Sequence, residues 1–232
     1  QDQLAGFDVP LEGFHTETGP GVYEAAVAAA EGVAGGDRAA LFKTAVKEIA
    51  ARHNLIPTFM AKWNAELPGS SGHIHQSLWK DGKSLFASAS GELPPLMKHY
   101  IAGLVANLCE LQVMMCPTIN SYKRTVPGVW APVNATWGVD NRTTAVRAIP
   151  SAGKSSRVEM RLPGADMNPY LAMAASLAAG LDGIERRLEP PPPTVNAYSG
   201  EAPPLARNLA EATRLFRSSA LARRAFGDEF VE

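Results

Sequence analysis

Carboxylate and imidazole side chains occur in this sequence at three places where a strand is expected to meet a turn. Glu17 and Glu24 flank a Gly-Pro-Gly turn. His73 and His75 alternate along one face of a predicted strand, and Glu159 lies between two arginines on another. Oxygen ligands with few nitrogens suit Mg²⁺ or Mn²⁺, whereas zinc takes more His or Cys. The pattern predicts a Mg²⁺ or Mn²⁺ site, against the alternatives of solvated surface carboxylates and a hydrogen-bonded His-x-His wall.

Guanidinium groups are concentrated in one part of the chain. Five of them fall within 38 residues, namely Arg124, Arg142, Arg147, Arg157 and Arg161. Any single arginine could pair with a surface acid, but a cluster favours planar bidentate contacts with carboxylate or phosphate oxygens. Together with metal ligands, this cluster indicates phosphoryl transfer. No Gly-x-x-x-x-Gly-Lys loop is present, which argues against a P-loop enzyme.

The overall composition restricts the class of protein and its partners. The chain has 232 residues and a formal net charge of -1, so its charge balance gives no reason to expect a nucleic-acid partner. Its two cysteines, Cys109 and Cys116, lie two helical turns apart, too far to bridge, which is typical of a reducing compartment. The apolar stretch 101–115 is too short to span a membrane, and no signal segment is evident. We expect a cytoplasmic protein without a membrane partner.

The elements that must position these side chains are predicted from periodicity and capping residues. Asp37 is expected to cap an amphipathic helix, and Pro169 to occupy the first turn of an Ala-rich one. Because strands and helices do not alternate regularly, the expected class is α+β, one domain with an antiparallel sheet and packed helices. The predicted strands lie within 15–30, 55–63, 72–79 and 157–162, and the predicted helices at 37–53, 93–115, from 168 onward, and 205–226.

Three stretches of the chain resemble the glutamine synthetase family in content, order and spacing. They are Gly69-Ser-Ser-Gly-His-Ile-His-Gln-Ser-Leu-Trp79, Asn120-Ser-Tyr-Lys-Arg-Thr-Val-Pro-Gly128, and Arg157-Val-Glu-Met-Arg-Leu-Pro163 followed by Asn168-Pro-Tyr170. The resemblance runs from about His15 to at least Leu188. It implies the family's catalytic-domain fold, a curved antiparallel sheet or half-barrel flanked by helices. Residues 1–232 are expected to form the C-terminal part of that domain, without the N-terminal β-grasp domain and the first catalytic strands, which carry a Glu-x-Glu pair.

The resemblance also implies a role for each candidate site residue. Metal ligands are Glu17, Glu24, His73 and Glu159. Glutamate contacts are Gly69, Arg124 and Arg161. Nucleotide and phosphate contacts are His75, Ser77, Arg142, Arg147, Lys154 and Arg157. The residues expected to act in the reaction itself are Arg142, Arg124 and, in the nucleophile pocket, Trp130.

The implied reaction has two steps and requires ATP with Mg²⁺ or Mn²⁺. The side-chain carboxylate of glutamate attacks the γ-phosphate of ATP to give γ-glutamyl phosphate, and an amine or ammonia then displaces phosphate. Metals and arginines neutralise the charge on the transferred group. Family members assemble as homo-oligomeric rings, dodecamers among them, in which a neighbour's N-terminal domain completes each site, so a chain of this extent is expected to be incomplete on its own.

One position departs from the ammonia-using pattern. Ammonia-using members have a glutamate six residues after the arginine of the Asn-Ser-Tyr-Lys-Arg motif, where this sequence has Trp130. An indole cannot accept a proton, but it can pack against an organic amine through apolar and cation-π contact. The surrounding segments 128–132 and 137–142 also resemble the branch that makes γ-glutamyl-polyamines and related amides. The prediction is therefore an organic amine or polyamine as nucleophile.

Three rival interpretations are weighed against that prediction. The first is an ammonia-using glutamine synthetase in which a neighbouring carboxylate substitutes for the missing glutamate. The second is a non-catalytic relative kept for structural or regulatory contacts, which the intact set of predicted metal ligands disfavours. The third is a guanidino kinase, which shares an antiparallel sheet and arginine clamps, but the His-x-His strand and the Asn-Ser-Tyr-Lys-Arg loop favour the ligase.

Overall fold

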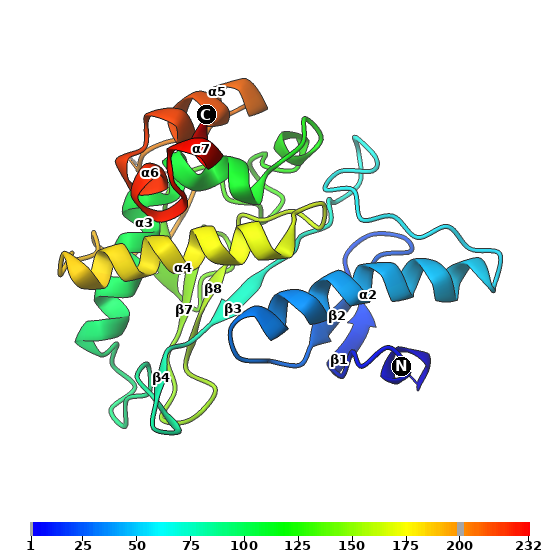
Figure 1. Cartoon of the computed structure of the whole chain (residues 1–232), viewed down its shortest axis with the longest axis horizontal. Helices are drawn as coiled ribbons and strands as arrows, with labels where there is room; N and C mark the ends of the chain where they lie inside the picture. Colours follow the sequence, from blue (N-terminus) through cyan, green and yellow to red (C-terminus); the bar gives the residue numbers. More distant parts are fainter. Residues whose placement is uncertain (1, 199–201) are drawn as a thin grey trace.

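The computed structural model describes residues 2–198 and 202–232, and it is an α+β arrangement as predicted. Figure 1 shows a small open sheet covered by helices, with a hairpin and a long helix beside it. The strands are β1 (Leu11–Thr16), β2 (Tyr23–Val27), β3 (Ile74–Gln76), β4 (Trp79–Lys80), β5 (Lys83–Ser84), β6 (Trp137–Val139), β7 (Val146–Ile149) and β8 (Arg157–Met160). The helices are α1 (Asp2–Ala5), α2 (Val33–Ala51), α3 (Pro95–Met115), α4 (Pro169–Glu185), α5 (Leu209–Ser218), α6 (Ala220–Phe226) and α7 (Asp228–Val231), with a 3₁₀ turn at Ser121–Lys123.

The central sheet has the strand order β3-β8-β7-β6. Strands β3, β8 and β7 pair antiparallel, but β6 and β7 run parallel, so the sheet is not antiparallel throughout as expected. The difference arises in the loop 140–145, which runs back along β6 before β7 begins. Asn141 stabilises that loop, because its Oδ1 accepts hydrogen bonds from the backbone N–H and the hydroxyl of Thr143.

Helices α3 and α4 cover one face of this sheet and pack closely on each other (Figure 1). Their backbones approach each other at Gly103 and Gly183, where an added methyl group on either residue would overlap with the opposite helix. Alternate residues of the strands, including Val146, Val158 and Met160, are buried against the two helices. The opposite face of the strands is therefore left to carry polar side chains.

The hairpin β1–β2 and helix α2 lie to one side of the sheet (Figure 1). Helix α2 begins at Val33, so Asp37 does not cap it as predicted. Instead, the Asp37 carboxylate accepts a hydrogen bond of 2.7 Å from the Tyr170 hydroxyl at the start of α4. The ring of Tyr170 contacts Gly36, where no side chain would fit. This contact ties α2 to the helix that covers the sheet.

Two further sequence predictions are wrong in detail and two are confirmed. Residues 55–63 form an irregular segment rather than a strand, because they are tied to side chains, such as Asn120, rather than to a neighbouring strand. The segment 205–226 is two helices, since Ser219 leaves the helical conformation and caps α6 through the Ala222 N–H. Helix α4 has Pro169 in its first turn as expected, and both cysteines are free. In the described part of the chain, no helix is long and apolar enough to cross a membrane.

Candidate functional site

The polar face of the sheet centres on Glu159. Strand pairing places His75 of β3 and Arg147 of β7 directly opposite Glu159 of β8, one on each side. Side chains alternate along β8, so the burial of Val158 and Met160 in the core directs Glu159 to the opposite face. Strand register thus brings β3, which is distant in the sequence, together with the consecutive strands β7 and β8.

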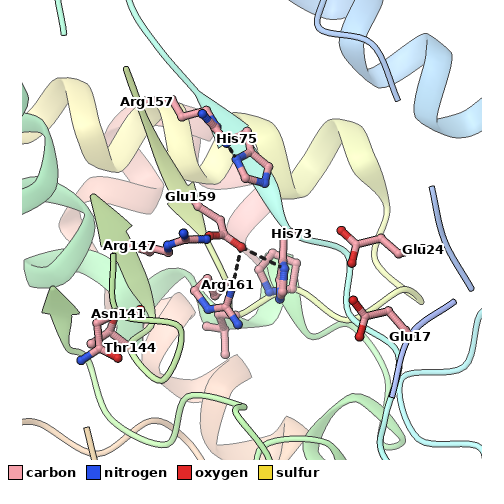
Figure 2. Close-up of polar contacts among 12 residues, drawn as sticks. Glu17, Glu24, His73, His75, Asn141, Thr144, Arg147, Arg157, Glu159 and Arg161 are labelled. Atoms are coloured by element: carbon pink, nitrogen blue, oxygen red, sulfur yellow. Dashed lines mark hydrogen bonds and ion pairs between the residues drawn. The ribbon is translucent and has the colours of Figure 1, made fainter. Parts of the chain in front are cut away.

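Both carboxylate oxygens of Glu159 are engaged (Figure 2). One oxygen accepts from Arg161 and lies 3.0 Å from Nδ1 of His73, and the other accepts from Arg147 at 3.1 Å. Only 3% of the residue is exposed. Burial alone would raise the pKa of Glu159, but the hydrogen bond from His73 and the charge of Arg161 outweigh it and hold the pKa well below its usual range. The carboxylate is therefore a fixed negative charge.

The imidazole of His73 is kept neutral by its surroundings. Burial lowers its pKa to about 4, although the hydrogen bond to Glu159 acts in the opposite direction. The positive charges of Arg161 and Arg124 add to the lowering. A neutral imidazole beside an ionised carboxylate is the protonation state that metal binding requires.

The nucleotide-side candidates lie around β3 and the start of β8. Arg157 Nε donates to Nδ1 of His75 at 3.0 Å, and partial burial lowers the pKa of His75 (Figure 2). Ser77 accepts a hydrogen bond of 2.8 Å from the Trp79 indole N–H. Lys154 is exposed in the loop between β7 and β8. The structure thus pairs His75 with Arg157. Ser77 directly follows β3, and Lys154 lies in the loop before β8.

The glutamate-side candidates meet at the end of β8. Arg124 is buried, and its Nη2 donates to the carbonyl oxygens of Arg161, Leu162 and Pro163. Burial lowers the pKa of this guanidinium. A methyl group on Gly69 would lie 2.7 Å from Cγ of Arg124, so only glycine fits there. Three of the predicted residues, Gly69, Arg124 and Arg161, are therefore neighbours.

Three arginines around this site keep an unused donor. The Nε–H groups of Arg124, Arg147 and Arg161 are buried and have no hydrogen-bond partner among the residues that the structure describes. Buried donors are normally satisfied, and an unmade bond of a charged group is costly. These donors fit oxyanion ligands such as carboxylate and phosphate.

The remaining two predicted residues lie on exposed loops. Arg142 is exposed, and its positive charge is one of the causes that lower the pKa of Arg161, after burial. Trp130 is 60% exposed and has a φ of 58°, a left-handed conformation that non-glycine residues seldom adopt. Neither side chain is in direct contact with the Glu159 cluster in any hydrogen bond or ion pair found between described residues.

A second cluster lies on the β1–β2 hairpin and includes a residue that the sequence analysis missed. Nε2 of His15 lies 3.3 Å from Glu17 Oε1 and 3.5 Å from Glu24 Oε2. All three residues are exposed. The Thr18 N–H, which donates to Glu17, lowers the pKa of Glu17, whereas burial and the neighbouring Glu17 raise the pKa of Glu24. His15 could have been found from its spacing, because residues 15 and 17 share one face of a strand.

The donor atoms present fit a divalent cation better at the hairpin than at the sheet. His15, Glu17 and Glu24 each offer a ligand atom, and these atoms lie within 4.8 Å of one another. At the sheet, His73 and Glu159 are together, but the carboxylate oxygens of Glu159 already accept from two arginines. Glu17 and Glu24 lie on the His73 side of that cluster (Figure 2).

Comparison with known proteins adds to this geometry. Residues 1–232 match the family described as "Glutamine synthetase, catalytic domain". The chain is 47% identical to "Type-1 glutamine synthetase 2" of Dictyostelium discoideum, over 99% of its own length and 46% of that protein. It is also 47% identical to "Glutamate--isopropylamine ligase" of Pseudomonas sp, over 97% of this chain and 50% of that protein.

Two more matches extend the comparison to an amide synthetase and to a solved structure. Identity is 45% with "Gamma-glutamylethanolamide synthetase GlnA4" of Streptomyces coelicolor, over 100% of this chain and 50% of that protein. The solved structure "Apo GmaS without ligand" superimposes with a TM-score of 0.88 at 34% identity, covering 98% of this chain and 55% of that one. The chain thus spans about half the length of the curated relatives that it matches.

Proposed function

Because the chain belongs to the glutamine synthetase family, we propose that it is the catalytic part of an ATP-dependent ligase that joins an amine to the side-chain carboxylate of glutamate. The observation that supports this most directly is the group of three arginines around Glu159 whose buried Nε–H donors are unused. Such a group suits a reaction in which negatively charged carboxylate and phosphoryl oxygens must be brought together.

The proposed roles follow from where each side chain lies. Arg124 and Arg161, with Gly69 beside them, bind the carboxylates of glutamate. Arg147 and Arg142 neutralise charge on the transferred phosphoryl group as the glutamate carboxylate attacks it.

The nucleotide is held on the β3 side of the site. There the ATP contacts are His75, Ser77, Lys154 and Arg157. Mg²⁺ or Mn²⁺, held by Glu17, Glu24, His73 and Glu159, would supply further charge neutralisation. The product of the first step is γ-glutamyl phosphate, which an amine then attacks.

We assign the second step to an organic amine because of Trp130. The indole is 60% exposed on a loop, so one of its faces is free to pack against an alkyl or polyamine chain. A carboxylate at this position would attract ammonium by its charge and accept its proton, whereas the indole has no charge and cannot accept a proton. Two of the similar proteins are named for an alkylamine and an amino alcohol substrate.

A second candidate is an ammonia-using enzyme, which the 47% identity to a type-1 glutamine synthetase favours. The two candidates differ in the nucleophile alone. Assembly into a homo-oligomeric ring belongs to either version of the proposal, since family members of that kind share their sites between neighbours.

The proposal is tested on the full-length protein to which this catalytic part is expected to belong, by following ATP-dependent phosphate release with glutamate and Mg²⁺. Ammonium and a panel of mono-, di- and polyamines are compared, with mass spectrometry of the amide formed. We expect turnover with an organic amine that exceeds turnover with ammonium. Trp130→Glu should shift the preference toward ammonium. Val195→Glu, which adds the same charge at a residue that is 94% exposed, is the matched control and should leave the preference unchanged. Ammonium-selective turnover in the unmutated protein would favour the second candidate, and no turnover with any amine would contradict the ligase itself.

A further inference from the structure

The β1–β2 hairpin aligns His15 with the two carboxylates through its register. His15 of β1 is the direct cross-strand partner of Glu24 in β2. Glu17 follows His15 by two residues, and its N–H donates to the Val22 carbonyl at 2.9 Å, so the pairing continues to this point. Residues two apart and directly opposed share one face of a hairpin. The three side chains therefore converge because of the backbone.

The opposite face of the hairpin fixes this arrangement. The rings of Phe14 and Tyr23 stack there with centroids 5.5 Å apart and planes within 3° of parallel. Such a pair adds stability to a two-stranded hairpin that has no third strand among the described residues. The stacked rings on one face therefore help to fix the strand register that places His15 opposite Glu24 on the other face.

The separations between the donor atoms suit direct coordination. Metal–nitrogen and metal–oxygen bonds of about 2.1 Å place neighbouring ligand atoms about 3.0 Å apart in an octahedron and about 3.4 Å apart in a tetrahedron. Nε2 of His15 lies 3.3 Å and 3.5 Å from the carboxylate oxygens of Glu17 and Glu24. The imidazole is thus already at a ligand's distance from each carboxylate, and all three donor atoms lie within 4.8 Å of one another.

The hairpin cluster also carries uncompensated negative charge. No lysine or arginine forms an ion pair with Glu17 or Glu24 in the part of the chain that the structure describes. Glu159, in contrast, is paired with two arginines. The hairpin carboxylates therefore remain available to a cation from solution.

We infer that His15 is a third protein ligand of the cation site formed with Glu17 and Glu24, and that its imidazole makes this site prefer Mn²⁺ to Mg²⁺. Mg²⁺ binds oxygen ligands almost exclusively and keeps several waters, whereas first-row transition ions accept imidazole nitrogen readily. The role of this cation in catalysis rests on the proposed function, but its binding and selectivity do not.

The competing explanation is that His15 only pairs with the two carboxylates and orients them. In that case the loss of His15 would weaken Mn²⁺ and Mg²⁺ binding to the same extent, because both ions would lose the same orientation of oxygen ligands. The ratio of the two affinities therefore separates a ligand from a positioning residue.

The experiment is calorimetric titration of the protein with MnCl₂ and with MgCl₂, without ATP or glutamate. The variants are His15→Gln and, as a matched control, His53→Gln, which removes an exposed histidine after α2. Glu24→Gln identifies which binding step belongs to the hairpin. We expect His15→Gln to weaken Mn²⁺ binding at that step at least about tenfold and Mg²⁺ binding by less than about threefold. His53→Gln should change neither affinity.

Equal weakening of both ions, or no weakening of either, would overturn the inference. Because the His15 side chain is 56% exposed, the substitution should not disturb folding, and circular dichroism checks this point. Failure of the ligase proposal would be seen differently, as absent turnover in the unmutated protein while the Mn²⁺ preference and its dependence on His15 persist.

Discussion

The sheet and the hairpin both bring carboxylates to an imidazole, but they treat the charge in opposite ways. Glu159 is 3% exposed and is held by Arg147, Arg161 and His73, whereas the hairpin carboxylates are exposed and have only His15 near them. The charge of Glu159 is thus compensated by neighbouring side chains, whereas that of the hairpin carboxylates is not. The difference teaches that one part of the site is preorganised by folding, while the other should respond to the ion it binds.

The largest effect is expected for Glu159→Gln. The substitution leaves the buried Arg161 without a counter-charge and Arg147 with only the exposed Asp140, so the free energy of unfolding should fall by about 3 kcal/mol, and turnover should be lost. Asp140→Asn removes the other, 63% exposed partner of Arg147 and should cost less than about 1 kcal/mol. Urea denaturation measures both variants. Similar small losses would show that the sheet cluster is no more preorganised than the hairpin.

Acidification should act mainly on the sheet cluster. The folded-state pKa of His73, about 4, lies below its ordinary value of 6.5, so between these values the unfolded chain binds a proton that the folded chain does not. The free energy of unfolding should therefore fall by roughly 2 kcal/mol as pH decreases from 6.5 to 4. The lowered pKa of Glu159 extends the loss to lower pH.

This pH dependence is checked by denaturation at several pH values. His73→Gln should flatten the slope between pH 6.5 and 4, and His53→Gln, which changes an exposed histidine elsewhere, should not. A slope that survives in His73→Gln would mean that another group carries the titration.

Gly69→Ala tests whether the packing around the buried Arg124 is as rigid as the Glu159 cluster. The new methyl group would overlap with the Ala61 carbonyl and crowd Arg124, and the expected cost is about 1–2 kcal/mol, with weaker binding of glutamate. Gly153→Ala is the matched control, because a methyl group there meets nothing within 4 Å. Thermal unfolding and isothermal titration with glutamate provide the two readouts. If both alanine variants have the same stability and the same affinity for glutamate, the segment 61–70 shifts to accommodate the added methyl group.

The smallest effect on stability is expected at the hairpin itself. Glu24→Gln changes an exposed residue, so the free energy of unfolding should stay within about 0.5 kcal/mol of the unmutated protein. The variant should, however, lose the increase in melting temperature that Mn²⁺ gives the unmutated protein. A large loss of stability in the absence of metal would show that the hairpin, like the sheet, depends on internal charge pairing.

Much of the fold was predictable where one rule decided the local structure. The α+β class, the start of α4 at Pro169 and the turn between Glu17 and Glu24 follow from the element pattern and from the Pro and Gly positions. Asp37 shows where such rules fail, because its carboxylate is used in a tertiary hydrogen bond to Tyr170. The parallel pairing of β6 with β7 could not be predicted from the sequence either, because the direction of a strand depends on the path of the loop before it.

For the site, sequence reasoning supplied residue types but not their protonation or pairing. The motifs name Glu159 and His73, yet the engagement of both Glu159 oxygens by arginines depends on strand register. His15 was missed although its spacing places it on the same strand face as Glu17, and its pairing with Glu24 is known only from the hairpin register. The roles of all the predicted site residues, Trp130 and Arg142 among them, stay predictions.

The close contact between α3 and α4 has a consequence for how the molecule exchanges its amide hydrogens. Because Gly103 and Gly183 bring the two backbones together, neither helix can separate without exposing the buried face that supports the sheet. Amides at this crossing should therefore exchange with deuterium only when the whole domain opens, whereas those of the β1–β2 hairpin should exchange through local opening. Deuterium labelling should thus show slow exchange in the helices α3 and α4 that support the strand of Glu159. Exchange should be rapid in the hairpin around Glu17 and Glu24, and bound Mn²⁺ should slow it there.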